Sequence, residues 1–118
     1  MKFFAAVLAL ATVAVAAPSN PPNFVKDSVA CACVNKAGVY AAGDICTKSG
    51  GWVTRDLPGG LCYPHTPSAA DMTKAITDAY CKQEYGQYGW DKATCRPVKL
   101  CEMWPGEITF KDQWIECP

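Results

Sequence analysis

The chain has 118 residues, half of which are hydrophobic, and its formal net charge at pH 7 is zero. This length suits one domain rather than two. The eleven basic residues are scattered without a run of three, so the sequence lacks the concentrated basic face that binds nucleic-acid phosphates.

The first 16 residues have the pattern of a secretory signal peptide. Lys2 supplies the positive start, and an almost unbroken apolar run from Phe3 to Val13 follows it. Cleavage after Ala16 is favoured, because a cut one residue later would leave Pro18 directly beside it. The apolar run is short for a bilayer span, so we expect an extracellular protein without membrane insertion.

The remaining chain is predicted to be a proline-rich extended arm, residues 17–27, followed by a single disulfide-rich domain, residues 28–118. An even number of cysteines in a short exported chain indicates four disulfides, whose pairing the sequence leaves open. We expect neither a metal nor a cofactor, since there is no Cys-x-x-Cys pair and there is one histidine. The cysteines are Cys31, Cys33, Cys46, Cys62, Cys81, Cys95, Cys101 and Cys117.

Short strands separated by turns are predicted in the first half of the domain. Residues 28–36 alternate as a strand does, which places Cys31 and Cys33 on one face. These two are too close to bond each other, so they should reach two different partners. Further short strands are expected at residues 39–41 and 52–54, with turns between them.

One main helix is predicted over about residues 68–85. Ser68 is the expected N-cap, Asp71 the acidic half of a capping box, and Gly86 the end. At about 100° per residue, Cys81 lies roughly opposite Met72, so a disulfide there would clamp the helix from its back or flank. One buried stripe is expected from Ala69, Met72, Ala75, Ile76, Ala79 and Tyr80.

A strand over residues 94–103 and a final hairpin of residues 107–110 and 112–116 are expected after the helix. Pro97 confines its strand to an edge or a bulge. The predicted fold class is α+β, with the main helix packed on a small, mostly antiparallel sheet and stapled by four disulfides.

His65 is the only histidine and the obvious candidate for catalysis. A position near a helix N-terminus favours a neutral imidazole, which suits a general base. However, the serines lie in arm, turn or cap contexts, no Gly-x-Ser-x-Gly motif occurs, and nothing fixes Arg55, Arg96 or Glu84 beside it. We therefore interpret His65 as a loop or capping residue and expect no catalytic residue.

A glycine-spaced aromatic loop follows the predicted helix. Its side chains, Tyr85, Tyr88 and Trp90, are candidates for stacking on sugar rings or on the surface of a partner. The alternative is that this loop folds over the core. The other tryptophans are expected to build the core, namely Trp52, Trp104 and Trp114.

The signal MKFFAAVLALATVAVAA, the small mature size and the eight spread cysteines resemble the small secreted cysteine-rich proteins of filamentous fungi. That group includes plant-pathogen effectors and killer-toxin-like antimicrobial proteins, and several of them are disulfide-stapled α+β folds. The resemblance covers the whole chain but is compositional, so it carries over no site residue.

Two functions follow from these observations. The first is a secreted effector or interaction protein that binds a host protein or another extracellular molecule without catalysis. The alternative is an antimicrobial or killer-toxin-like protein that binds a cell-wall glycan such as chitin, and a small secreted hydrolase is third. The near-neutral charge favours the first, because membrane-active peptides are usually basic. We expect a monomer.

Overall fold

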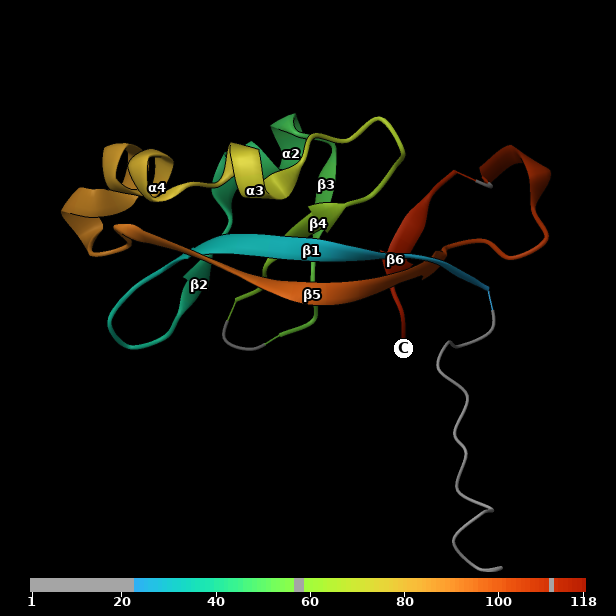
Figure 1. The fold of residues 1–118 in the computed structure, drawn as a ribbon, viewed down its shortest axis with the longest axis horizontal. Helices are drawn as coiled ribbons and strands as arrows, with labels where there is room; N and C mark the ends of the chain where they lie inside the picture. The colour runs from blue at the N-terminus through green and yellow to red at the C-terminus, as the bar shows by residue number, and fades with distance from the viewer. Residues whose placement is uncertain (1–22, 57–58, 111) are drawn as a thin grey trace, which may run out of the picture.

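The computed structural model describes residues 23–56, 59–110 and 112–118 and shows a fold dominated by antiparallel sheet (Figure 1). The predicted signal peptide and most of the predicted arm lie outside the described residues. The elements in chain order are β1 Phe24–Val34, β2 Tyr40–Ala41, α2 Gly43–Lys48, β3 Gly51–Val53, β4 Cys62–Pro64, α3 Met72–Ala75, α4 Asp78–Tyr85, the 3-10 helix η1 Gly86–Tyr88, β5 Lys92–Glu102, the 3-10 helix η2 Ile108–Phe110 and β6 Trp114–Glu116.

The sheet is built around the long antiparallel pair β1 and β5, which have eleven residues each. Its strand order is β3-β4-β1-β5-β6, and β2 adds to β1. Just past β4, the carbonyl of His65 accepts a hydrogen bond from Trp114 N at 2.8 Å, while His65 N donates to Gly50 O at 3.2 Å. These bonds bring β6 back to the end of β4, so the sheet nearly closes into a barrel.

The predicted α+β class, with one main helix over about residues 68–85, is therefore wrong. The longest helix in the described part of the chain, α4, has eight residues, and α3 ends two residues short of its start. The cause is local, because Asp71 caps α3 through Thr73 N and Thr77 caps α4 through Tyr80 N. A capping side chain satisfies the first N–H groups of a new helix and so competes with continuation of the preceding one.

The helix break also overturns the predicted position of Cys81. Cys81 lies on the buried face of α4, in the same cluster as Met72, and bonds to Cys33 of β1. The predicted angle between Met72 and Cys81 assumed one continuous helix. Ile76 is extended, with φ −112° and ψ 92°, so the count of about 100° per residue does not hold across it. No segment has to pass over the back of the helix to reach this disulfide.

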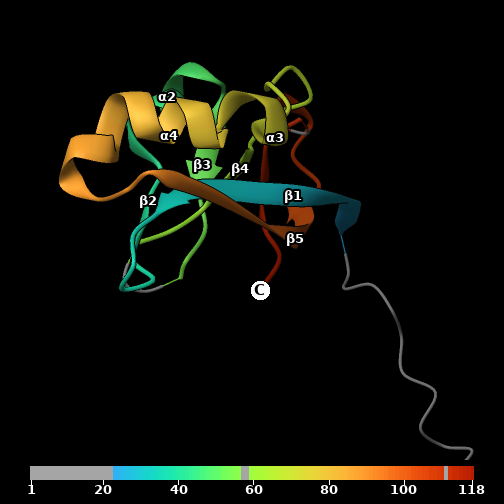
Figure 2. The same ribbon diagram turned by 60° about the vertical axis from the view of Figure 1, so that its left-hand side comes forward.

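The helices α2, α3 and α4 lie together on one side of the sheet, as both views show (Figure 2). Between them and the sheet is a first hydrophobic cluster, which we call the helix-side core. A second cluster, the barrel core, lies inside the curved sheet. The helix-side core contains Cys31, Cys33, Ala42, Cys46, Cys62, Met72, Ile76 and Cys81. The barrel core contains Ala30, Ala32, Leu61, Tyr63, Val98, Leu100 and Trp114.

The four predicted disulfides are present, and all eight cysteines are used. As expected for two residues on one face of a strand, Cys31 and Cys33 reach different partners. Four disulfides in a domain of this size fit an extracellular protein. The pairs are Cys31–Cys95, Cys33–Cys81, Cys46–Cys62 and Cys101–Cys117.

Several boundaries differ from the prediction. β1 begins at Phe24 rather than Ser28, and α2 occupies a segment predicted to turn. The predicted last hairpin does not form, since residues 108–110 are a 3-10 helix and β6 pairs with β5. In the described part of the chain, no helix is long and apolar enough to cross a membrane.

The tryptophan prediction is correct for one residue of three. Trp114 is buried in the barrel core, at 9% exposure. Trp52 and Trp104 are each 43% exposed, so neither is a core residue. Trp52 belongs to β3, which stands at the end of the strand order, so one of its edges has no paired strand among the described residues.

Candidate functional site

The structure separates the three aromatic residues that were predicted to bind a partner. Tyr85 ends α4 and is half-buried against the helix-side core, where its ring makes an edge contact with Tyr80 at 6.2 Å. Burial and the hydrogen bond with Tyr85 raise the pKa of Tyr80 to about 12. A Cβ at Gly43, whose φ is +65°, would lie 1.8 Å from the Tyr85 hydroxyl, so α2 and α4 are in close contact here. Tyr85 is a packing residue.

Trp90 also has a structural role. Its ring packs half-buried against the helix-side core, and its indole N–H donates to Val39 O at 2.9 Å. This bond ties the end of the aromatic loop to the segment just before β2. Because Trp90 is needed to hold the loop in place, it is not a free stacking platform.

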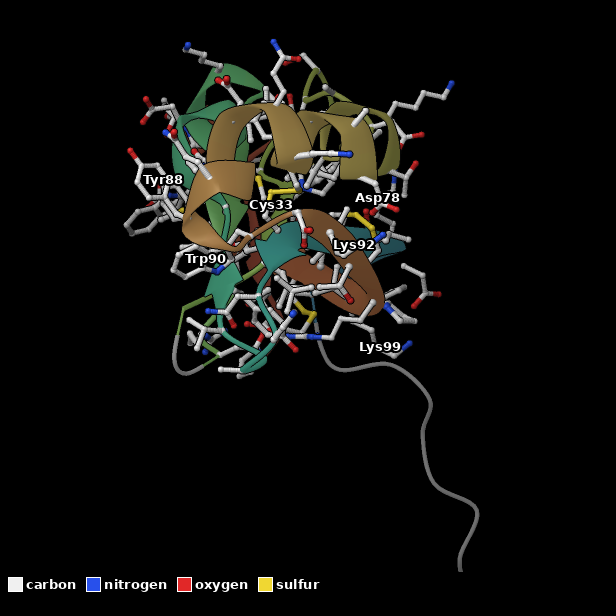
Figure 3. The ribbon with its side chains drawn as sticks, turned by 90° about the vertical axis from the view of Figure 1, so that its left-hand side faces the viewer. Cys33, Asp78, Tyr88, Trp90, Lys92 and Lys99 are labelled. Carbon is white, nitrogen blue, oxygen red and sulfur yellow. A yellow bond between two sulfur atoms is a disulfide. The ribbon has the colours of Figure 1, made fainter. Side chains whose placement is uncertain are left out.

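Tyr88 is the member of the trio that faces outward, with 66% of its surface exposed. It ends η1, and Gly89, in the left-handed region at φ +97°, turns the chain toward β5. Figure 3 shows Tyr88 and Trp90 on the same side of the molecule, beside α4. The tyrosine ring therefore stands out from a loop that its neighbours anchor.

A groove with a volume of about 530 Å³ lies beside Tyr88, and we call it the Tyr88 groove. One wall is the turn between β1 and β2 and the other is the loop from η1 to β5. The turn is held by Asn35, whose side-chain oxygen accepts hydrogen bonds from Ala37 N and Val39 N at 3.0 and 2.9 Å. The lining residues are Asn35, Lys36, Ala37, Tyr88, Gly89 and Asp91.

The chemistry of this groove is that of a binding surface. It offers one exposed aromatic face with an exposed lysine and an exposed aspartate of opposite charge. Such a surface can stack on a sugar ring or cover an apolar side chain while its charges orient polar groups. Within residues 23–56, 59–110 and 112–118, no cluster of three metal-binding side chains occurs.

His65 does not line this groove and has structural contacts of its own. Its ring stacks on Trp52 at 3.8 Å between centroids with planes 7° apart. Its Nδ1 lies 2.6 Å from Trp114 O, and because a carbonyl only accepts, Nδ1 is the donor. Together with the two backbone bonds of His65, these contacts place it at the junction of β3, β4 and β6.

A charged network is present near the C-terminal strand. Arg96 of β5 is hydrogen-bonded to Asp56 and lies 3.5 Å from Glu116, to which Arg55 N also donates. Hydrogen bonds from Thr54 and Arg96 lower the pKa of Asp56, and the bond to Asp56 raises the pKa of Arg96. The network links the segment after β3 to β5 and β6, which is a structural role.

Sequence reasoning found Tyr88 but missed the opposite wall of its groove. Asn35, Lys36 and Ala37 are more than 50 positions away along the chain, and β1–β5 pairing brings them close, with Val34 opposite Lys92. A turn signal was visible at Gly38, but no local pattern places that turn beside Tyr88. Comparison of the chain with protein-family models, curated proteins and solved structures found no significant match.

Proposed function

We propose that this protein is a secreted, disulfide-stabilised effector or interaction protein that binds an extracellular host molecule through the Tyr88 groove and performs no chemistry on it. The observation that carries the proposal is the exposed ring of Tyr88 beside a groove of about 530 Å³. Exposed aromatic residues that border a groove are typical anchors of a binding surface.

The groove is also rigidly supported, which favours binding because little order has to be gained on association. The Cys33–Cys81 disulfide fixes α4 to β1, and the Trp90–Val39 hydrogen bond fixes the loop that follows. Asn35 holds the opposite wall through two backbone N–H groups. An aromatic anchor on such a support loses little conformational entropy when a partner covers it.

The test is affinity purification with tagged, oxidised protein from host extracellular fluid, read by quantitative mass spectrometry. We expect a set of host proteins that untagged protein displaces and that Tyr88→Ala no longer retains. Gln87→Ala, an exposed neighbour on η1, is the matched control and should retain the same set. Equal retention by Tyr88→Ala and wild type would contradict the proposal.

A glycan is the second candidate partner, and the polar lining of the groove favours it. An aromatic ring flanked by Lys36 and Asp91 can stack on a sugar while charged groups bind its hydroxyls. The test is retention on insoluble chitin. Binding that survives Tyr88→Phe but not Tyr88→Ala would support stacking. Trp90→Ala is unsuitable because Trp90 holds the loop in place.

A further inference from the structure

A second surface lies at the opposite end of β1 from the Tyr88 groove, where the strand has an unpaired edge. β5 pairs with β1 along its length, but β4 pairs with it at Cys31 alone and β2 at Cys33 and Val34. On the side away from β5, the described residues provide no ladder partner for residues 24–30.

The pairing pattern identifies which backbone groups this edge presents. Cys31 and Cys95 lie opposite each other with Cα atoms 4.1 Å apart, the close spacing of a non-hydrogen-bonded antiparallel pair. Because the pattern alternates, Val29 opposite Pro97 and Asp27 opposite Lys99 are pairs of the same kind. Pro97 has no N–H to donate, which agrees with this assignment.

In a non-hydrogen-bonded pair the N–H and C=O of each residue point away from the facing strand. Those of Cys31 and Cys33 are therefore directed toward β4 and β2, where their ladders lie. The N–H and C=O of Asp27 and Val29 point the same way, and no described residue forms a backbone hydrogen bond with them.

The reason for the gap is that the chain leaves β1 after β4. Continuing the Cys31–Cys62 register would place Pro64 opposite Val29, and Pro64 has no N–H. The next residue, His65, bonds to Gly50 and Trp114 instead. The chain thus turns toward β3 and β6, and β1 is left without its neighbour.

A groove of about 350 Å³ lies along this edge, and we call it the β1-edge groove. Its floor includes the buried Trp114, over which Lys26 Nζ sits 5.5 Å from the ring centroid. Its far wall is the segment from Pro64 to Met72. That wall is preformed, because Ala70 N donates to Ser49 O at 2.9 Å and Ala69 N to Thr66 O at 3.1 Å.

We propose that the β1-edge groove binds a single extended peptide segment of a partner protein, which adds a strand to β1 by hydrogen-bonding to Asp27 and Val29. The occupant carries an apolar side chain at alternate positions, because the 37%-exposed Val29 and the accessible Ala69 and Ala70 line the groove. Alternate side chains of an added strand point to the same face, while the backbone bonds supply affinity.

A second copy of this chain does not fit the same groove. Its own β1 carries β5 on the other edge, so it would bring a whole sheet against the wall formed by Pro64 to Met72. A separate peptide has both edges free and is narrow enough to lie between the two walls. The residues that precede β1 in this chain, Pro-Ser-Asn-Pro-Pro, have three positions without an N–H and are poor strand partners.

The first measurement is amide hydrogen exchange of the free, oxidised protein by NMR. We expect the amides of Asp27 and Val29 to exchange fast, while those of Ser28 and Ala30, which face β5, are protected. Protection of Asp27 and Val29 in the free protein would show that the edge is already occupied and would overturn the proposal.

The second measurement selects ligands with a phage-displayed library of random linear peptides and tests the enriched sequences as synthetic peptides. Val29→Pro removes the groove-facing N–H but no bond to β5, and it should weaken binding about tenfold or more. Val29→Ala, which keeps the N–H, and Tyr88→Ala, which alters the other groove, are the controls and should retain the affinity within about threefold.

A third arm leaves the protein unchanged and so does not depend on the folding of a variant. The enriched peptide is N-methylated at one backbone position at a time. We expect an alternating pattern, with every second methyl group abolishing binding. Uniform tolerance of N-methylation, or peptides that bind Val29→Pro as well as wild type, would overturn the proposal for the β1-edge groove. Neither result would affect the proposed binding function of the Tyr88 groove.

Discussion

The two faces of β1 are stabilised by different means. Ala30 and Ala32 face the barrel core, where the large side chains of Leu61, Leu100 and Trp114 pack. Cys31 and Cys33 face the helix-side core, where five of the eight buried members are cysteines. The barrel strands are linked by Cys31–Cys95 and Cys101–Cys117 but also pack large apolar side chains, whereas the helical layer has few large apolar side chains and depends mainly on its disulfides.

The lengths of the helices explain this difference. α2, α3 and α4 have six, four and eight residues, which is too short for stability in isolation. Two disulfides, Cys33–Cys81 and Cys46–Cys62, attach α4 and α2 to the strands. A small domain with little apolar surface to bury gains from such links. The Tyr88 groove lies at the tip of this attached layer.

Removing a large side chain from the barrel core should have the largest effect. Leu100→Ala opens a cavity at a fully buried position, and we expect a loss of about 2–5 kcal/mol in the free energy of unfolding. Chemical denaturation followed by fluorescence measures it. Ile108→Ala, at an 83%-exposed position, is the control and should change stability by less than about 0.5 kcal/mol. Equal effects would mean that the barrel core does not dominate stability.

Removing the Cys33–Cys81 disulfide should cause the next largest loss of stability, and it should separate the unfolding of the helical layer from that of the barrel. We expect Cys33→Ala with Cys81→Ala to cost about 2–4 kcal/mol. Because the barrel core contains neither cysteine, far-ultraviolet circular dichroism should lose helical signal at lower denaturant than the amides that pair β1 with β5 lose their protection from hydrogen exchange. A single coincident transition would contradict the separation of the two layers.

A substitution of His65 tests how much its ring stabilises the contact that brings β6 back to the end of β4. His65→Ala removes the stack on Trp52 and the Nδ1 bond to Trp114 O but leaves the backbone bonds, so we expect a loss of about 1–2 kcal/mol. The measurement is the unfolding midpoint, with the fluorescence of Trp52 and Trp114 as a local report. A variant as stable as wild type would show that the ring does not support closure.

The smallest expected effect is on the stability of the protein at acid pH. The pKa of Asp56 is below its usual 3.8, since Thr54 and Arg96 donate hydrogen bonds to the carboxylate. The Asp56 carboxylate therefore makes its full contribution to the free energy of unfolding above pH 3.8. This contribution is lost as pH falls through the lower pKa of the folded state. The melting temperature of Asp56→Asn should fall less steeply than that of wild type over this acid range. Parallel curves would contradict the role of Asp56.

The sequence predicted well what depends on near neighbours. The alternation around Cys31 and Cys33 placed both on one face because side chains in a strand repeat every two residues. Four disulfides followed from the cysteine count and the predicted signal peptide. The binding role predicted for Tyr85, Tyr88 and Trp90 stays a prediction, and of the three Tyr88 is the exposed one.

The remaining features depend on competition or on distant contacts. The apolar stripe across residues 69–80 indicated one helix, but the capping bonds of Asp71 and Thr77 divided it. The prediction for Cys81 failed with it, since its angle was counted across the break. Barrel closure rests on His65 and Trp114, which are 49 positions apart, and nothing in the local pattern of either residue specifies that pair.

The most direct test of the two-layer account is amide hydrogen exchange of wild type and the Cys33→Ala, Cys81→Ala variant under native conditions. The account predicts that the amides pairing β1 with β5 keep their protection, while those of α4 and η1 lose theirs and the Tyr88 groove loosens. A uniform loss of protection across both layers would contradict it.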